Sequence, residues 1–204
     1  MDCFKIKEGS SLVRVFHASP QAPKVDVYID GNLAFSDLGF KEFTNYVYLD
    51  EGSYKVEVYP AGTKENAAIS EIVDVPDGEI VTVAATGNLD DLSLLVIPDY
   101  VSKETSDSYS TFRVIHLSPD APAVDILVDE DVLFEDIEFR EGTEYVDVKP
   151  GKYNITIALS SDGKSVLSFE VTLNPNRIYT IYAVGDAANL RAIQSVDGNT
   201  YVCK

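Results

Sequence analysis

Histidine, serine and aspartate recur close together at two places in the sequence, and these three side chains can together perform nucleophilic hydrolysis. His17 is followed two residues later by Ser19 and nine residues later by Asp26. The same spacing is repeated by His116, Ser118 and Asp125. In hydrolases of this kind the histidine takes the proton of the serine, while the aspartate orients the histidine.

The spacing nevertheless argues against catalysis. Two residues apart in an extended segment, a histidine and a serine point the same way but lie about 6–7 Å apart at Cβ. No G-x-S-x-G segment, which would expose a serine nucleophile on a sharp turn, is present. We therefore expect no enzyme. Each histidine is interpreted as part of a corner, where it caps a turn and bonds a backbone group or the aspartate.

The residues around each histidine favour the same structural interpretation. Two prolines follow it and stiffen the turn. An arginine precedes it in an otherwise apolar strand, where pairing with a carboxylate would explain a buried guanidinium. The structural motif predicted for the two places consists of Arg14, His17, Pro20, Pro23 and Asp26, and of Arg113, His116, Pro119, Pro122 and Asp125.

Motifs for metals and cofactors are missing from the sequence. Asp26 and Asp30 are four residues apart on one predicted strand, which separates their Cα atoms by about 13 Å. Calcium needs oxygen atoms within about 2.6 Å of one point. No EF-hand, P-loop, GxGxxG or zinc spacing occurs. We expect no catalytic, cofactor or metal site; acidic loops could converge on calcium, but no motif supports this.

An internal repeat supplies the elements that must position these residues. Residues 12–54 align without a gap with residues 111–153 at an offset of 99, and after one lost residue Gly87 matches Gly185. The polar segment 100–110 between the copies is predicted to be a linker. We predict one domain over 1–99, with a short arm at 1–10, and a second over 111–204, with a short C-terminal arm.

Both copies have the sequence pattern of β-structure. Residues 24–30 and 54–59 alternate between apolar and polar side chains, and turn signals such as Asp30-Gly31 recur every 8–12 residues. No credible amphipathic helix is present. We predict an all-β chain of two tandem Ig-like antiparallel β-sandwich domains with about seven strands each. A five- or six-stranded barrel is the alternative.

The segment RVFHASPQAPKVDVYIDG and its partner RVIHLSPDAPAVDILVDE resemble the signature of the DUF4397 family, a domain of unknown function. The resemblance covers both copies and therefore nearly the whole chain. It implies a β-sandwich that is often found in tandem in bacterial and archaeal surface or secreted proteins. It implies no known catalytic residues.

Charge and hydropathy exclude several classes of partner. The formal net charge is −18, and a chain this acidic repels phosphate backbones, so no nucleic-acid partner is expected. No stretch approaches the roughly 18 apolar residues of a membrane span, and the first residues lack the apolar run of a signal peptide. We expect a protein at a cell or spore surface that has no recognisable signal peptide, with the cytoplasm as the alternative.

The two cysteines, Cys3 and Cys203, stand close to the two ends of the sequence. They are either reduced or joined within one chain, or they join different chains. A domain with an odd number of antiparallel strands starts and ends at opposite poles, so two in series would form a rod of at least about 40–60 Å. A disulfide needs Cα atoms within about 7 Å. We therefore expect intermolecular disulfides that join copies head to tail, a contact that builds a filament.

These observations predict a non-enzymatic structural subunit of a surface fibre, appendage or coat, such as a spore appendage. Its partner would be further copies of itself in a homopolymer. The alternative is a surface binding module for carbohydrate or protein, because sandwich loops often carry such sites. An exposed cluster of tyrosines such as Tyr46, Tyr48 and Tyr59 would favour that alternative.

Overall fold

A computed structural model describes residues 5–99 and 105–202. These residues form β-strands and three short 3-10 helices, which confirms the prediction of an all-β chain. The chain divides into two compact units, the first holding β1 to β8 and the second β9 to β16. The finer boundaries, with a linker at 100–110, stay a prediction.

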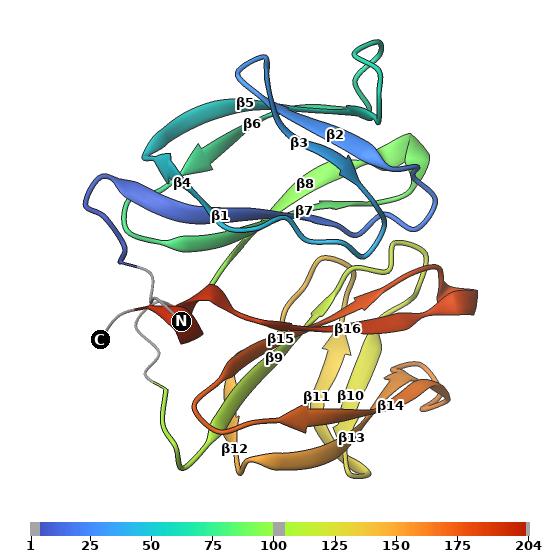
Figure 1. Ribbon diagram of the computed structural model, residues 1–204. Coiled ribbons are helices and arrows are strands. Elements are labelled where there is room, and N and C mark those ends of the chain that lie inside the picture. The colour runs from blue at the N-terminus through green and yellow to red at the C-terminus, as the bar shows by residue number, and fades with distance from the viewer. Residues whose placement is uncertain (1–4, 100–104, 203–204) are drawn as a thin grey trace. The chain divides into compact units, whose positions relative to one another are not determined.

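The first unit contains two four-stranded sheets that pack face to face, in the orders β4-β1-β7-β8 and β3-β2-β5-β6 (Figure 1). A 3-10 helix, η1, precedes the last strand. The elements are β1 (Ser10–His17), β2 (Val25–Ile29), β3 (Asn32–Leu38), β4 (Val47–Asp50), β5 (Gly52–Pro60), β6 (Ile69–Val75), β7 (Ile80–Thr86), η1 (Leu89–Asp91) and β8 (Ser93–Pro98).

The second unit repeats this arrangement with sheets in the orders β12-β9-β15-β16 and β11-β10-β13-β14. Its elements are β9 (Ser110–His116), β10 (Val124–Val128), β11 (Asp131–Ile137), β12 (Val146–Val148), β13 (Gly151–Leu159), β14 (Ser165–Leu173), β15 (Ile178–Val184), η2 (Ala187–Asn189), β16 (Arg191–Val196) and η3 (Gly198–Tyr201).

The core of each unit lies between its two sheets. β-Branched side chains fit a pleated, half-buried surface, and the core of the first unit is built mainly from valine, including Val27, Val56 and Val83. The second unit has isoleucine at the same three positions of the repeat, namely Ile126, Ile155 and Ile181. The two units therefore share one fold but fill it with side chains of different size.

Two details differ from the sequence prediction of about seven antiparallel strands. The part of each unit that the structure describes has eight strands, because the short edge strands β4 and β12 are too brief to show an alternating pattern. In addition, β1 pairs with β7 in parallel, and β9 pairs with β15 in the same way. The alternation of apolar and polar residues shows which face of a strand is buried. It does not show whether the strand pairs in parallel or antiparallel with a strand that is distant in the sequence.

The chain enters and leaves each sandwich at the same end. Leu12 of β1 lies beside Ile80 in the parallel pair, and Pro98 of β8 lies beside Val81 in the antiparallel pair. The start of β1 and the end of β8 therefore meet at the start of β7. The second unit repeats this at the start of β15, with the pairs Thr111–Ile178 and Tyr179–Val196. The expectation that each domain begins and ends at opposite poles is wrong, because the strand number is even.

Candidate functional site

His17 ends β1 and is buried, as is His116 at the end of β9. The ring Nε2 of His17 lies 3.0 Å from the carbonyl oxygen of Pro23, and that of His116 lies 3.3 Å from the carbonyl oxygen of Pro122. A carbonyl oxygen only accepts, so Nε2 carries the proton and donates in both copies. Burial lowers the pKa of both histidines, which keeps both rings neutral at pH 7.

The serine of each motif is bonded away from the histidine. The Ser19 hydroxyl donates to the carbonyl oxygen of Gly87 at 2.8 Å, and the Ser118 hydroxyl donates to that of Gly185 at 2.6 Å. Within the part of the chain that the structure describes, neither hydroxyl bonds an imidazole nitrogen. The two serines therefore tie the corner after the first strand to the loop after β7 or β15, and they do not form a nucleophile with the histidine.

The aspartates of the motif fix turns through backbone amides. Asp26 accepts the N–H of Asp37 at 2.9 Å on one oxygen and the N–H of Gly62 at 2.8 Å on the other. Asp125 accepts the N–H of Asp136 at 2.9 Å and the hydroxyl of Ser160 at 2.6 Å. Both Asp37 and Asp136 have a φ of 58°, a left-handed conformation that these bonds help to hold.

The arginines are also buried, each within a polar cluster on its sheet. The Nε of Arg113 donates to the Thr180 hydroxyl at 2.9 Å, and this hydroxyl donates to the Asp197 carboxylate at 2.8 Å. The guanidinium also lies over the ring of Tyr145, 4.5 Å from its centroid. Thr180 thus links the guanidinium to the carboxylate that the sequence led us to expect.

The first copy has a matching cluster of Arg14, Thr82, Tyr46 and Asp99. Sequence reasoning missed the threonine, tyrosine and aspartate in both copies as members of one cluster. The signal was present, because all three recur at the offset of the repeat.

The two histidines differ at their other ring nitrogen. The Nδ1 of His116 accepts the N–H of Ser118 at 3.2 Å. Among the described residues, the Nδ1 of His17 has no hydrogen-bond partner, although this histidine is only 1% exposed. His17 lines a recess of about 120 Å³ whose other walls are mainly apolar. This recess is the candidate binding site of the first unit.

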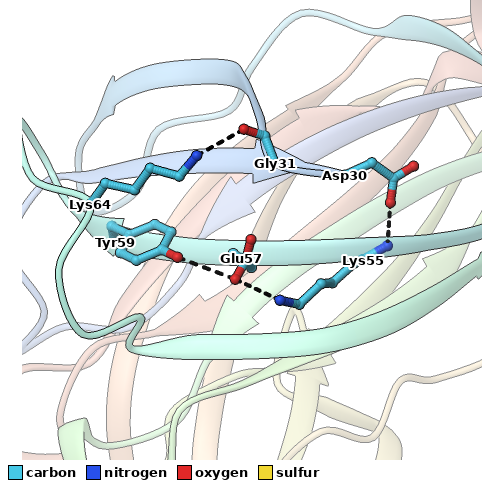
Figure 2. A network of polar contacts seen from close by, with 6 residues as sticks. All are labelled: Asp30, Gly31, Lys55, Glu57, Tyr59 and Lys64. Carbon is cyan, nitrogen blue, oxygen red and sulfur yellow. Dashed lines mark hydrogen bonds and ion pairs between the residues drawn. The ribbon is translucent and has the colours of Figure 1, made fainter.

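A second polar feature lies on the β3-β2-β5-β6 sheet of the first unit (Figure 2). The Glu57 carboxylate accepts a hydrogen bond from the Lys55 ammonium at 2.8 Å and another from the Tyr59 hydroxyl at 3.2 Å. The bond from Lys55 lowers the pKa of Glu57 and the same bond raises the pKa of Lys55, while burial raises the pKa of Tyr59. The Lys64 ammonium donates to the carbonyl oxygen of Gly31 at 2.8 Å.

Tyr46, Tyr48 and Tyr59, whose clustering would favour a surface binding module, do not form one cluster. Tyr46 donates to Asp99, Tyr48 on β4 donates to the carbonyl oxygen of Lys5, and Tyr59 lies on the other sheet. Tyr59 instead meets Tyr28 edge to face at 5.4 Å, and the face of the Tyr28 ring is covered by Lys64 at 4.4 Å. No open row of ring faces is presented there.

Cys3 and Cys203 lie outside the described residues. Within residues 5–99 and 105–202, no three His, Cys, Asp or Glu side chains are grouped closely enough to hold a metal ion. Over the same residues, no helix has the length and apolar composition needed to cross a membrane.

Comparison with protein families gives two adjacent matches to one model, described as a domain of unknown function, DUF4397. The matches cover residues 11–110 and 110–202. The chain belongs to the DUF4397 family. The resemblance carried by the two His-Ser-Pro segments is thereby confirmed, together with the tandem arrangement of two DUF4397 domains. Comparison with curated proteins gave no match.

Three solved structures illustrate what the tandem DUF4397 chain is similar to. A family 26 carbohydrate-binding module of Eubacterium rectale, solved with maltoheptaose, is 9% identical over 93% of this chain and 99% of its own, with a TM-score of 0.32. A cell adhesion protein of Bacteroides uniformis is 10% identical over 93% and 99%, with a TM-score of 0.30. The fimbrial anchor protein Mfa2 of Porphyromonas gingivalis is 8% identical over 93% and 98%, with a TM-score of 0.25. Similarities this low do not indicate a shared function.

Proposed function

We propose that this chain is a non-enzymatic structural subunit of a surface assembly such as a fibre, appendage or coat. One observation supports this most directly: the polar residues shared by the two copies hold the sandwiches together. The histidine donates to a proline carbonyl, the serine donates to a glycine carbonyl, and the aspartate accepts backbone amides or a hydroxyl. A repeated motif used in this way serves a scaffold, whereas a catalytic motif would bring serine and histidine together.

The finer part of the proposal is that Cys3 and Cys203 join neighbouring copies into a homopolymer. In the sequence, Cys3 precedes Ser10, where β1 begins, and Cys203 follows Val196, where β16 ends. Because the chain enters and leaves each sandwich at the same end, the two arms are not forced to opposite poles of their units. Pairing within one chain is therefore the competing outcome, and the experiment must separate the two.

The test uses the full chain, oxidised in a glutathione buffer and analysed by electrophoresis without reductant and by negative-stain microscopy. We expect a ladder of multimers that reductant collapses to one band, and filaments on the grid. The matched controls are the single variants C3S and C203S, each of which should stay a monomer by itself, whereas an equimolar mixture of the two should stop at a dimer.

A single band that carries an internal Cys3–Cys203 bond in peptide mass spectrometry would overturn the homopolymer, as would a band unchanged by reductant. The double variant C3S/C203S should unfold at the same temperature as the parent chain. This control separates a failure to link from a failure to fold.

One observation favours the alternative function, a surface binding module for carbohydrate or protein. The Lys55–Glu57–Tyr59 network is confined to the first copy, because Asn154, Thr156 and Ala158 occupy the matching positions of the second. The second copy folds without the network, so the fold does not require it. A glycan panel tested against the parent and against K55N/E57T, which restores second-copy residues, would reveal such binding by a signal that the variant loses.

A further inference from the structure

The recess in the first unit presents an apolar surface. It measures about 120 Å³, and it opens to solvent beside Ala68 and Leu89, which are both exposed. Among the described residues that line it, only His17 and Ser19 have polar side chains, and each of these two residues is 1% exposed. The surface that a ligand would touch is therefore almost entirely apolar.

The two polar side chains of the lining offer a ligand no hydrogen bond. Nε2 of His17 donates to the carbonyl oxygen of Pro23, and the Ser19 hydroxyl donates to that of Gly87. Nδ1 of His17 is buried, so a molecule in the recess does not reach it. A polar group that entered the recess would lose its water without gaining a partner. These conditions select a ligand that has no polar groups.

The second copy shows that the fold does not require the open volume. Where the first copy has Val58 and Ala68 around the recess, the second copy has the larger side chains of Ile157 and Val166. Ile157 is completely buried in the core of the second unit, and Val166 packs against that core. The recess thus forms where the first copy has smaller side chains at positions that the fold is able to fill.

The mouth of the recess differs between the copies in the opposite direction. Leu89 begins η1 and is 51% exposed, whereas the second copy has Ala187 at this position. Burying apolar surface stabilises a complex, and Leu89 would bury more of its side chain once a ligand fills the recess. The first copy therefore has less apolar volume inside the recess and more apolar surface at its mouth.

We propose that the first unit binds a small neutral hydrocarbon molecule, of benzene's size or slightly smaller, in this recess. An apolar cavity of about 150 Å³ in another protein binds benzene, and the recess here measures about 120 Å³. The ligand lies against Val58 and Ala68, and Leu89 covers it. The proposal goes beyond the structural role above and does not depend on it.

The test is an NMR titration of the full chain with benzene, and separately with pyrazine. Pyrazine has the same shape but carries nitrogen atoms at two opposite positions of the ring, so one of them must enter the recess without a partner. We expect saturable shifts of the methyl signals of Val58 and Ala68, with benzene bound at least about tenfold more tightly than pyrazine. The matching methyl groups of Ile157 and Val166 are an internal control, and their signals should not move.

Three variants test the position of the ligand by introducing residues of the second copy. A68V fills the recess and should weaken benzene binding at least about tenfold while leaving the unfolding temperature unchanged. V58I is the second filling variant should A68V fail to fold. L89A removes apolar surface at the mouth without filling the recess, and it should weaken binding about threefold or more.

Several results would overturn the proposal. These are a lack of saturation with benzene, equal affinity for pyrazine, and equal shifts at Ile157 and Val166. Binding that both filling variants leave intact would also overturn it. Unchanged affinity in L89A would overturn the part assigned to Leu89.

Discussion

Nε2 of His17 lies 3.0 Å from the carbonyl oxygen of Pro23, six residues further along the chain. Proline has no N–H to donate, and the segment that leaves β1 contains two prolines, Pro20 and Pro23. The imidazole N–H therefore supplies a hydrogen-bond donor across a turn in which the prolines leave few backbone N–H groups. This relationship explains why a histidine stands before Ser-Pro-x-Ala-Pro in both copies.

The buried histidines predict that stability falls in mild acid. Burial lowers the pKa of His17 and His116 in the folded chain, so the unfolded chain binds more protons near pH 6. The contribution is complete above the unfolded pKa of about 6.5 and is lost as the pH falls from there towards the folded pKa. Denaturant unfolding at pH 7.5 and 5.5 should show a loss of up to about 1.4 kcal/mol per pH unit for each histidine.

The control for this pH dependence is the double variant H17Q/H116Q. Glutamine can donate to the proline carbonyl but does not titrate, so the slope between pH 7.5 and 5.5 should flatten. An unchanged slope would assign the effect to carboxylates instead.

Replacing Asp26 by alanine should destabilise the first unit by roughly 1–3 kcal/mol, because the amides of Asp37 and Gly62 both lose a charged acceptor. Chemical denaturation measures the loss. The exposed residue Glu65 provides a matched control, and E65A should change the free energy of unfolding by less than about 0.5 kcal/mol. Equal effects of the two substitutions would contradict the structural role of Asp26.

Gly87 should tolerate no side chain. It has a φ of +111°, and a Cβ there would overlap the carbonyl oxygen of Asp91. We expect G87A to cost more than about 2 kcal/mol, since strain and overlap add. Gly78 is the comparison, because it has a φ of +74° but open space around it, so G78A should cost only about 1 kcal/mol. Thermal unfolding of both variants gives the ranking, and a reversed order would refute it.

Adding one methylene group to the first core and removing one from the second should change the free energy of unfolding differently. A void of about 20 Å³ lies beside Val56 in the first unit, whereas Ile155 is completely buried at the matching position of the second. I155V should cost about 0.5–1.5 kcal/mol. V56I should be neutral or stabilising, because space for the methylene exists. A loss of more than about 1 kcal/mol in V56I would show that the first core is already full.

The repeat and the two-residue alternation were enough to predict two β-sandwiches, because both patterns report burial directly. They could not predict that β1 pairs with β7 in parallel, since 68 residues separate Leu12 from Ile80 and local sequence does not encode such a partner. The position of each motif histidine at a corner followed from the neighbouring prolines. The sequence could not predict that the histidine bonds a proline carbonyl oxygen rather than the aspartate, because both lie within nine residues of the histidine. The structure was needed to distinguish them.

The recess beside His17 was not predicted from the sequence. A recess forms where side-chain volume is missing from several strands at once, and no single residue type marks it. The signal that could have revealed it is the drop in size between the copies, from Ile157 to Val58 and from Val166 to Ala68. Among the described residues, the buried Nδ1 of His17 has no hydrogen-bond partner, and the sequence gives no signal of this. Both copies have a serine two residues after the histidine, but only in the second copy does the serine N–H bond the ring.

The meeting of chain entrance and exit at one end of each sandwich has a mechanical consequence. Tension applied through Ser10 and Pro98 does not slide β1 and β8 along β7 in opposite directions, which would load all the ladder hydrogen bonds at once. It peels the two strands away from the start of β7, so the bonds break one after another at low force. A sandwich pulled in this way opens one hydrogen bond at a time and lengthens at low force. A fibre made of such units would therefore be extensible rather than stiff.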